Sequence, residues 1–216
     1  MALKTDQDLS DNARSLWLKA LSAMELRNFG YAISLLQAVL KEAPAFLDGR
    51  KMLRRAEIQS TKGKKSFFSG LSGAALKGGS LVKKDPVAAM ELAEKSLESD
   101  PYSSSANQLL CDAAKAAGMP EVAAFALETI VEGNPKDAKV LHALGDYYYE
   151  NGLSDKAIDI YTRITDINPA DLVATKRGKD AAPRHSMSSG GWEEVAKSGG
   201  TKDYRDLIKN KEEAVS

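Results

Sequence analysis

Residues 138–171 read AKVLHALGDYYYENGLSDKAIDIYTRITDINPAD and show most clearly how the chain folds. Apolar residues in this stretch recur at spacings of three or four, as they do on the buried face of an amphipathic helix. Gly152 interrupts the pattern halfway, where glycine adopts the positive φ of a tight turn at little cost. Pro169 ends the second apolar run, because proline lacks a backbone donor and restricts the residue before it. The stretch therefore predicts two helices joined by a turn.

The same marks return along the chain at a period of 34 residues. The prolines that end the second helices are Pro44, Pro101, Pro135 and Pro169. Their last two gaps are 34 residues, and the first gap of 57 is 34 plus an insertion of 23. Four alanines repeat these gaps: Ala32, Ala89, Ala123 and Ala157. Each alanine lies near the start of a second helix, where a larger side chain would push the crossing first helix away. Two markers in one register predict four helix pairs.

The residues of 138–171 on this pattern resemble the tetratricopeptide repeat family: Leu141, Leu144, Gly145, Tyr148, Ala157, Tyr161, Ile164 and Pro169. The resemblance extends over a domain at 13–171, with repeats at 13–46, 47–103, 104–137 and 138–171. The second repeat contains the insertion 61–84, and the third departs from the family at Asn107, where a large apolar residue is usual. The resemblance implies an all-α fold, a right-handed α-solenoid of about four helix pairs.

The remaining segments lie on either side of the repeats. Residues 1–12 are an N-terminal extension, and the polar segment 172–183 predicts a capping helix that ends before Pro183. Residues 184–216 begin with the Ser and Gly content of a flexible linker and return to helical spacing near the end. Because the last residues lack a Gly or Pro that would stop a helix, we interpret this end as a cut within a longer protein, with a docking helix as the alternative.

Composition narrows the classes of function. The chain has 216 residues, and its 30 basic and 30 acidic side chains cancel, which argues against a surface wholly devoted to nucleic acid or membrane. A single cysteine and two histidines leave few parts for catalysis or for a metal site. No apolar run approaches the roughly 18 residues of a membrane span, and the first residues do not read as a secretory signal. We expect no enzyme, no cofactor and no bound metal, in a cytoplasmic protein.

The family resemblance also implies a concave groove lined by the first helix of each repeat. The groove residues predicted in this way are Trp17, Leu21, Met24, Lys51, Arg55, Gln108, Asp112, Lys115, His142, Asp146 and Tyr149. An apolar start followed by the cations Lys51 and Arg55 suits a partner peptide with an apolar and an acidic residue. Alternatively, Trp17 packs against residues 1–12. Trp17 and Leu21 occupy places where the family's clamp for chaperone C-terminal tails needs Lys and Asn, so that partner is disfavoured.

The insertion 61–84 reads TKGKKSFFSGLSGAALKGGSLVKK, with six lysines and no acid. With Arg50, Lys51, Arg54 and Arg55 just upstream, ten cations face only Glu57. Three interpretations stay open: packing on the repeats, contact with an anionic membrane, or contact with an acidic protein or nucleic acid. Packing is favoured, and nucleic acid is unlikely because no recognition motif is present. The residues that would contact a membrane or an anionic partner are Lys64, Lys65, Phe67, Phe68, Leu71, Lys77, Lys83 and Lys84.

The sequence as a whole favours a non-catalytic scaffold that binds a partner peptide or subunit in the concave groove. The first alternative is a peripheral membrane adaptor that uses the basic insertion. A further alternative is an interaction domain of a longer protein whose C-terminal part is missing.

Overall fold

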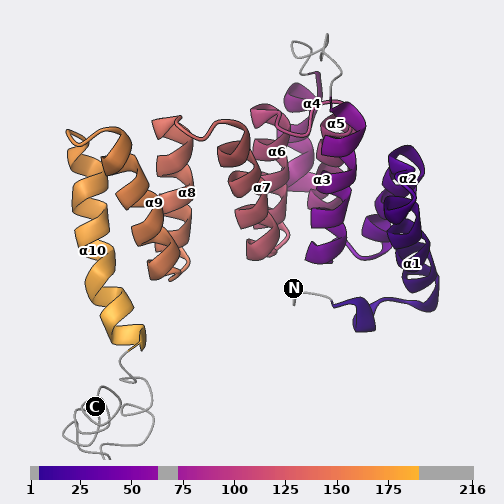
Figure 1. The fold of residues 1–216 in the computed structure, drawn as a ribbon, viewed down its shortest axis with the longest axis horizontal. Coiled ribbons are helices and arrows are strands. Elements are labelled where there is room, and N and C mark those ends of the chain that lie inside the picture. Colours follow the sequence, from indigo (N-terminus) through magenta and orange to yellow (C-terminus); the bar gives the residue numbers. More distant parts are fainter. Residues whose placement is uncertain (1–4, 63–72, 190–216) are drawn as a thin grey trace, which may run out of the picture. The chain divides into compact units, whose positions relative to one another are not determined.

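The computed structural model describes residues 5–62 and 73–189. Within these ranges the chain forms one short 3-10 turn and ten α-helices, with no strand (Figure 1). The helices are α1 (Asp11–Glu25), α2 (Phe29–Glu42), α3 (Leu47–Thr61), α4 (Gly73–Lys84), α5 (Pro86–Leu97), α6 (Ser104–Ala116), α7 (Pro120–Gly133), α8 (Ala138–Glu150), α9 (Ser154–Ile167) and α10 (Leu172–Ser189). The predicted all-α class is confirmed.

The chain divides into two compact units, Met1–Pro135 and Lys136–Ser216, which we call the first and second unit. In the first unit α1 packs on α2, α2 on α3, α5 on α6, and α6 on α7. In the second unit α9 packs between α8 and α10 (Figure 1). The helices of each of these pairs therefore lie side by side, as in other helical repeat proteins.

Local signals explain where the helices begin. The side chains of Ser10, Asn28, Asp85 and Asp137 each accept a hydrogen bond from a backbone N–H in the first turn of α1, α2, α5 and α8, respectively. Pro86 adds a fixed φ at the first position of α5, where no helical donor is required. These four helices thus begin where the sequence supplies a cap, whereas α3 and α6 begin without a side-chain cap.

Small residues sit where two helices cross. Ala32, Ala89, Ala123 and Ala157, the four marker alanines, are fully buried. Gly145 on α8 is equally restricted, because an added Cβ would lie 2.9 Å from Cε1 of Tyr161 on α9. The spacing of small residues in the sequence therefore reflects close approach of helix backbones.

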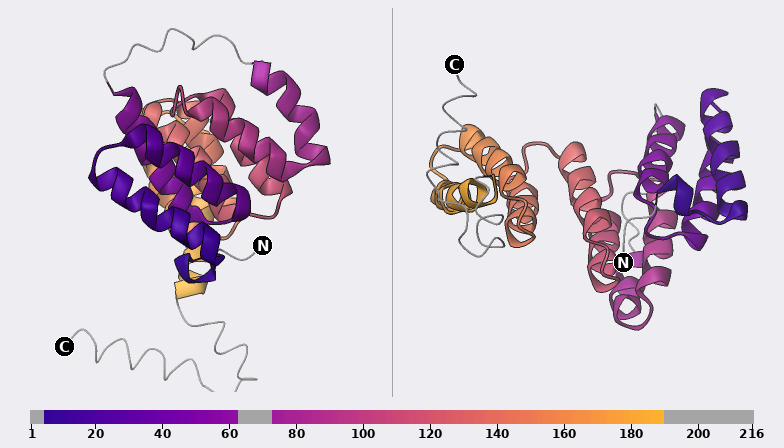
Figure 2. Two further views of the ribbon diagram at one scale, coloured as in Figure 1. Left: turned by 90° about the vertical axis from the view of Figure 1, so that its right-hand side faces the viewer. Right: turned by 90° about the horizontal axis from the view of Figure 1, so that it is seen from below.

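One feature agrees with the favoured packing of the insertion on the repeats, and a second differs from the sequence-based prediction. The C-terminal part of the insertion 61–84 is itself a helix, α4, which packs against α5 and α6 (Figure 2). The helix expected to end before Pro183 continues through this proline to Ser189, so the predicted boundary is wrong. A proline inside a helix removes one backbone hydrogen bond but does not prevent the helix from resuming.

Candidate functional site

The most unusual part of the repeats is the inner face of α3. The 34-residue frame places Arg54 at the position of Ala20 in the first repeat, Cys111 in the third and Gly145 in the fourth. The same frame places Arg50 where the fourth repeat has Leu141, and Glu57 where it has Tyr148. Three positions that are apolar or small in α8 are therefore charged in α3, and all three charged side chains are buried.

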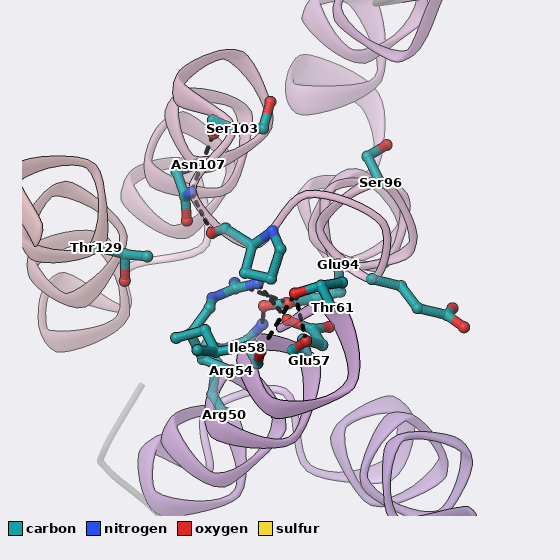
Figure 3. A network of polar contacts seen from close by, with 12 residues as sticks. Arg50, Arg54, Glu57, Ile58, Thr61, Glu94, Ser96, Ser103, Asn107 and Thr129 are labelled. Atoms are coloured by element: carbon teal, nitrogen blue, oxygen red, sulfur yellow. Dashed lines mark hydrogen bonds and ion pairs between the residues drawn. The ribbon is translucent and has the colours of Figure 1, made fainter. Parts of the chain in front are cut away.

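These charges form one network with Glu94 of α5 (Figure 3). Arg50 Nη1 pairs with Glu94 Oε1, and Arg54 Nη2 lies 3.1 Å from Glu94 Oε2. Arg54 also pairs through Nη1 with Glu57 Oε2, and Arg50 Nη2 donates to the Pro44 carbonyl at 2.8 Å. One carboxylate on α5 thus binds two guanidinium groups from α3.

The network leaves some buried atoms without a hydrogen-bond partner among the described residues: Arg50 Nε, Arg54 Nε and Glu57 Oε1. Burial raises the pKa of Glu57 to about 8, against the opposing effect of the Arg54 guanidinium. Glu57 therefore holds its proton to a higher pH than an exposed glutamate does, and Glu94 is shared by two guanidinium groups.

The outer face of α3 carries the predicted pair Lys51 and Arg55, one helical turn apart and both exposed. Neither forms an ion pair with a described residue. Arg50 and Arg54, one position earlier in each case, were expected to add to the positive charge of the insertion. That expectation is wrong, because both guanidinium groups point inward to Glu94.

The apolar start of the predicted groove is also different from the expectation. Trp17 is only 8 % exposed, and its ring packs edge-on against Phe46 at a centroid distance of 5.1 Å. Leu9, from the N-terminal extension, belongs to the same core. Leu21 and Met24 are partly buried against this core. Trp17 is therefore a core residue, as in the alternative interpretation, and is not available to a partner.

On α6 the predicted residues Gln108, Asp112 and Lys115 are exposed on one face. Gln108 Nε2 donates to Asp112 Oδ1 at 2.9 Å. The departure from the family at Asn107 has a structural role, since its buried amide donates to the carbonyls of Pro101 and Ser103 (Figure 3).

In the second unit, the predicted residues His142, Asp146 and Tyr149 come together against α10. His142 Nε2 lies 2.9 Å from Asp171 Oδ2, and Asp171 also accepts the backbone N–H of Ala174 in the first turn of α10. Asp146 accepts a hydrogen bond from Tyr161 at 2.6 Å and pairs with Arg177 at 3.7 Å. The Arg177 guanidinium lies 5.7 Å from the centre of the Tyr149 ring. This row is engaged within the unit by α10, which acts as its cap.

The residues of the proposed membrane contact fall mostly outside the described side chains. This holds for Lys64, Lys65, Phe67, Phe68, Leu71 and Lys77. Lys83 and Lys84, at the end of α4, are exposed. Membrane contact through this segment therefore stays a prediction.

Other reactive groups are structural. Cys111 is buried, and burial raises the pKa of its thiol to about 11, which keeps it protonated and unreactive near neutral pH. In the parts of the chain that the structure describes, no cluster of His, Cys, Asp and Glu could hold a metal ion. In the same parts, no helix has both the length and the apolar content needed to cross a membrane.

Helix pairs with a 34-residue period, crossed at small residues and stacked on their neighbours in sequence, define the class of helical repeat proteins. The tetratricopeptide repeat family model matches residues 109–171, which span most of the third repeat and the whole of the fourth. Residues 109–171 therefore consist of tetratricopeptide repeats. Such repeats generally serve as protein–protein interaction modules. No curated protein matches the chain.

Proposed function

We propose that the protein is a non-catalytic scaffold whose first unit binds an acidic segment of a partner protein on the outer face of α3. The observation that carries this proposal is the contrast between two pairs of cations on one helix. Arg50 and Arg54 are bound by acids of the chain itself, whereas Lys51 and Arg55 are exposed and form no ion pair with a described residue.

Two exposed cations one turn apart suit a chain with acidic residues at a matching spacing. Arginine can bind a carboxylate through two parallel hydrogen bonds, and lysine adds a second point of attraction. The packed network behind them fixes the backbone of α3, so the two side chains are presented from a rigid helix. Such binding should weaken as salt increases, because both cations are open to solvent.

A displayed peptide library, panned against the purified full chain, tests this proposal. We expect acidic peptides to be enriched by the wild type and lost with Lys51→Glu/Arg55→Glu. Lys19→Glu/Arg27→Glu is the matched control, since it makes the same change of charge at an exposed lysine on α1 and at an exposed arginine in the turn that follows. Equal enrichment by the wild type and Lys51→Glu/Arg55→Glu would show that the partner binds elsewhere.

A further inference from the structure

A pocket of about 430 Å³ lies in the first unit between α2 and α5, with α3 beneath it. This volume is within the range of roughly 300–1,000 Å³ that is usual for small-molecule sites. Neither Lys51 nor Arg55 lines the pocket, so it is separate from the face proposed above for a partner protein. Apolar side chains from all three helices form much of its wall: Leu40, Leu53, Val87, Met90 and Leu92.

The charges around the pocket are not balanced. Five charged residues line it: Lys41, Arg50, Glu91, Glu94 and Lys95. Glu94 is already neutralised by the two arginines of the buried network. The exposed lysines of α2 and α5 therefore face one exposed acid, Glu91, and neither lysine forms an ion pair with a described residue.

We propose that this pocket binds a small monocarboxylate with an apolar chain. The chain lies against the half-buried Val87 and Leu92, and the carboxylate lies between Lys41 and Lys95. Burial of the apolar chain supplies most of the affinity, and the two lysines select for the anion. An ammonium head group would meet the excess of positive charge and is rejected.

Isothermal titration calorimetry with four simple compounds tests the chemistry. Octanoate has both the carboxylate and the apolar chain. Acetate has only the carboxylate, octan-1-ol has only the chain, and octylammonium has the chain with a positive charge. We expect octanoate to bind at least about tenfold more tightly than each of the others, which corresponds to about 1.4 kcal/mol. No binding of octanoate, or equal binding of octanoate and octan-1-ol, would overturn the proposal.

The same carboxylate could come from the end of a peptide. A short peptide that ends in leucine, with a free or an amidated C-terminus, separates the two sources. We expect the free acid form of the peptide to bind more weakly than octanoate, because a pocket of about 430 Å³ leaves little room for the residues that precede the leucine. Tight binding of the free-acid peptide without binding of octanoate would show that the pocket binds the C-terminus of a peptide, and would refute the proposal.

Two variants locate the site. Ala88→Phe fills the pocket without a change of charge. Lys41→Glu/Lys95→Glu, the rim variant, reverses the charge of the two lysines that line the pocket. Each should weaken octanoate binding by about tenfold or more, whereas Lys51→Glu/Arg55→Glu should bind octanoate like the wild type. If Ala88→Phe does not fold, Lys41→Glu/Lys95→Glu still tests whether octanoate binds in this pocket. Both lysines are exposed, so their replacement should leave the fold intact. Unchanged binding in the rim variant would place octanoate outside this pocket.

Discussion

The first helices of the second and fourth repeats, α3 and α8, hold equal places in the 34-residue frame but pack by different chemistry. In α8 the inner positions are Leu141, Gly145 and Tyr148, and a second helix crosses closely over the glycine. In α3 the matching positions are Arg50, Arg54 and Glu57, and a buried ion network connects them to α5. One backbone arrangement thus tolerates either a tight apolar contact or a charged one.

The difference matters because the two contacts respond to different conditions. An apolar contact depends on shape and is almost insensitive to pH and salt. A buried ion network depends on its complete set of partners, since removal of one partner leaves a charge in a medium that solvates it poorly. The second repeat should therefore be the sensitive part of the fold, and the outward pair Lys51 and Arg55 depends on it for its position.

The largest effect is expected from loss of the shared carboxylate. Glu94→Ala leaves both guanidinium groups buried without their common partner and should lower the free energy of unfolding by about 3–5 kcal/mol. Urea denaturation measures the change. Glu91→Ala, on the exposed side of the same helix, is the control and should change stability by less than about 0.5 kcal/mol. Similar losses in both variants would mean that the network adds nothing to the packing of α5.

The network should also make stability depend on pH. Folding raises the pKa of Glu57 from 4.5 to about 8, so between these values the folded state holds a proton that the unfolded state has released. Its contribution to stability is complete below pH 4.5 and is lost as the pH rises through 8. The slope is at most about 1.4 kcal/mol per pH unit.

Urea denaturation of the wild type and Glu57→Gln over this range tests the slope. Glutamine keeps an acceptor for Arg54 but does not titrate, so the variant should show a flatter profile. Besides Arg54, the charged groups that influence Glu57 are Glu94 and Glu98 of the adjoining segment. Parallel profiles for the two proteins would assign the pH dependence to other groups.

The fold could be predicted from the sequence because its signals are local and repeated. Each proline and each marker alanine acts on its own helix pair, so agreement among four copies fixes the register without knowledge of distant contacts. The end of α10 was predicted wrongly for the same reason. A single proline is a local signal, and packing of α10 against α9 outweighs it.

The charged network could be predicted only in part. The frame already places Arg54 at the position of Ala20 and Gly145, which shows that a large charged residue replaces a small one. Its partner could not be found, because Glu94 lies 40 residues away across the insertion. The burial of Trp17 likewise depends on Phe46, at the far end of the same repeat, a contact that no local pattern reveals.

The apolar contact of the fourth repeat can be broken by overpacking. Ala157→Leu adds three carbons at a fully buried crossing and should cost about 1–3 kcal/mol in the free energy of unfolding. Ala143→Leu makes the same change at an exposed site on α8 and should have little effect. Chemical denaturation at two pH values sharpens the comparison with α3, because the cost of overpacking should not change with pH. An unchanged midpoint in Ala157→Leu would contradict the assigned register.

The smallest effect concerns the turns between paired helices. Gly118 and Gly152 adopt positive φ values of 69° and 75°, and the frame places Arg27 at the same position in the first repeat, with φ 56°. An L-residue with a side chain is destabilised in this left-handed conformation because its Cβ comes too close to the backbone, whereas glycine has no Cβ. Arg27→Gly should therefore raise the free energy of unfolding by about 0.5 kcal/mol, after allowance for the greater freedom of glycine in the unfolded chain.

Arg27→Ala is the control for that last substitution, because it removes the exposed charge but retains the Cβ that causes the strain. It should gain nothing over the wild type. The urea midpoint, read at an unchanged slope, measures both variants. If alanine stabilised the protein as much as glycine, the gain would come from the lost charge. A gain with glycine alone would show that the first repeat retains a strained version of the turn that the third and fourth repeats make with glycine.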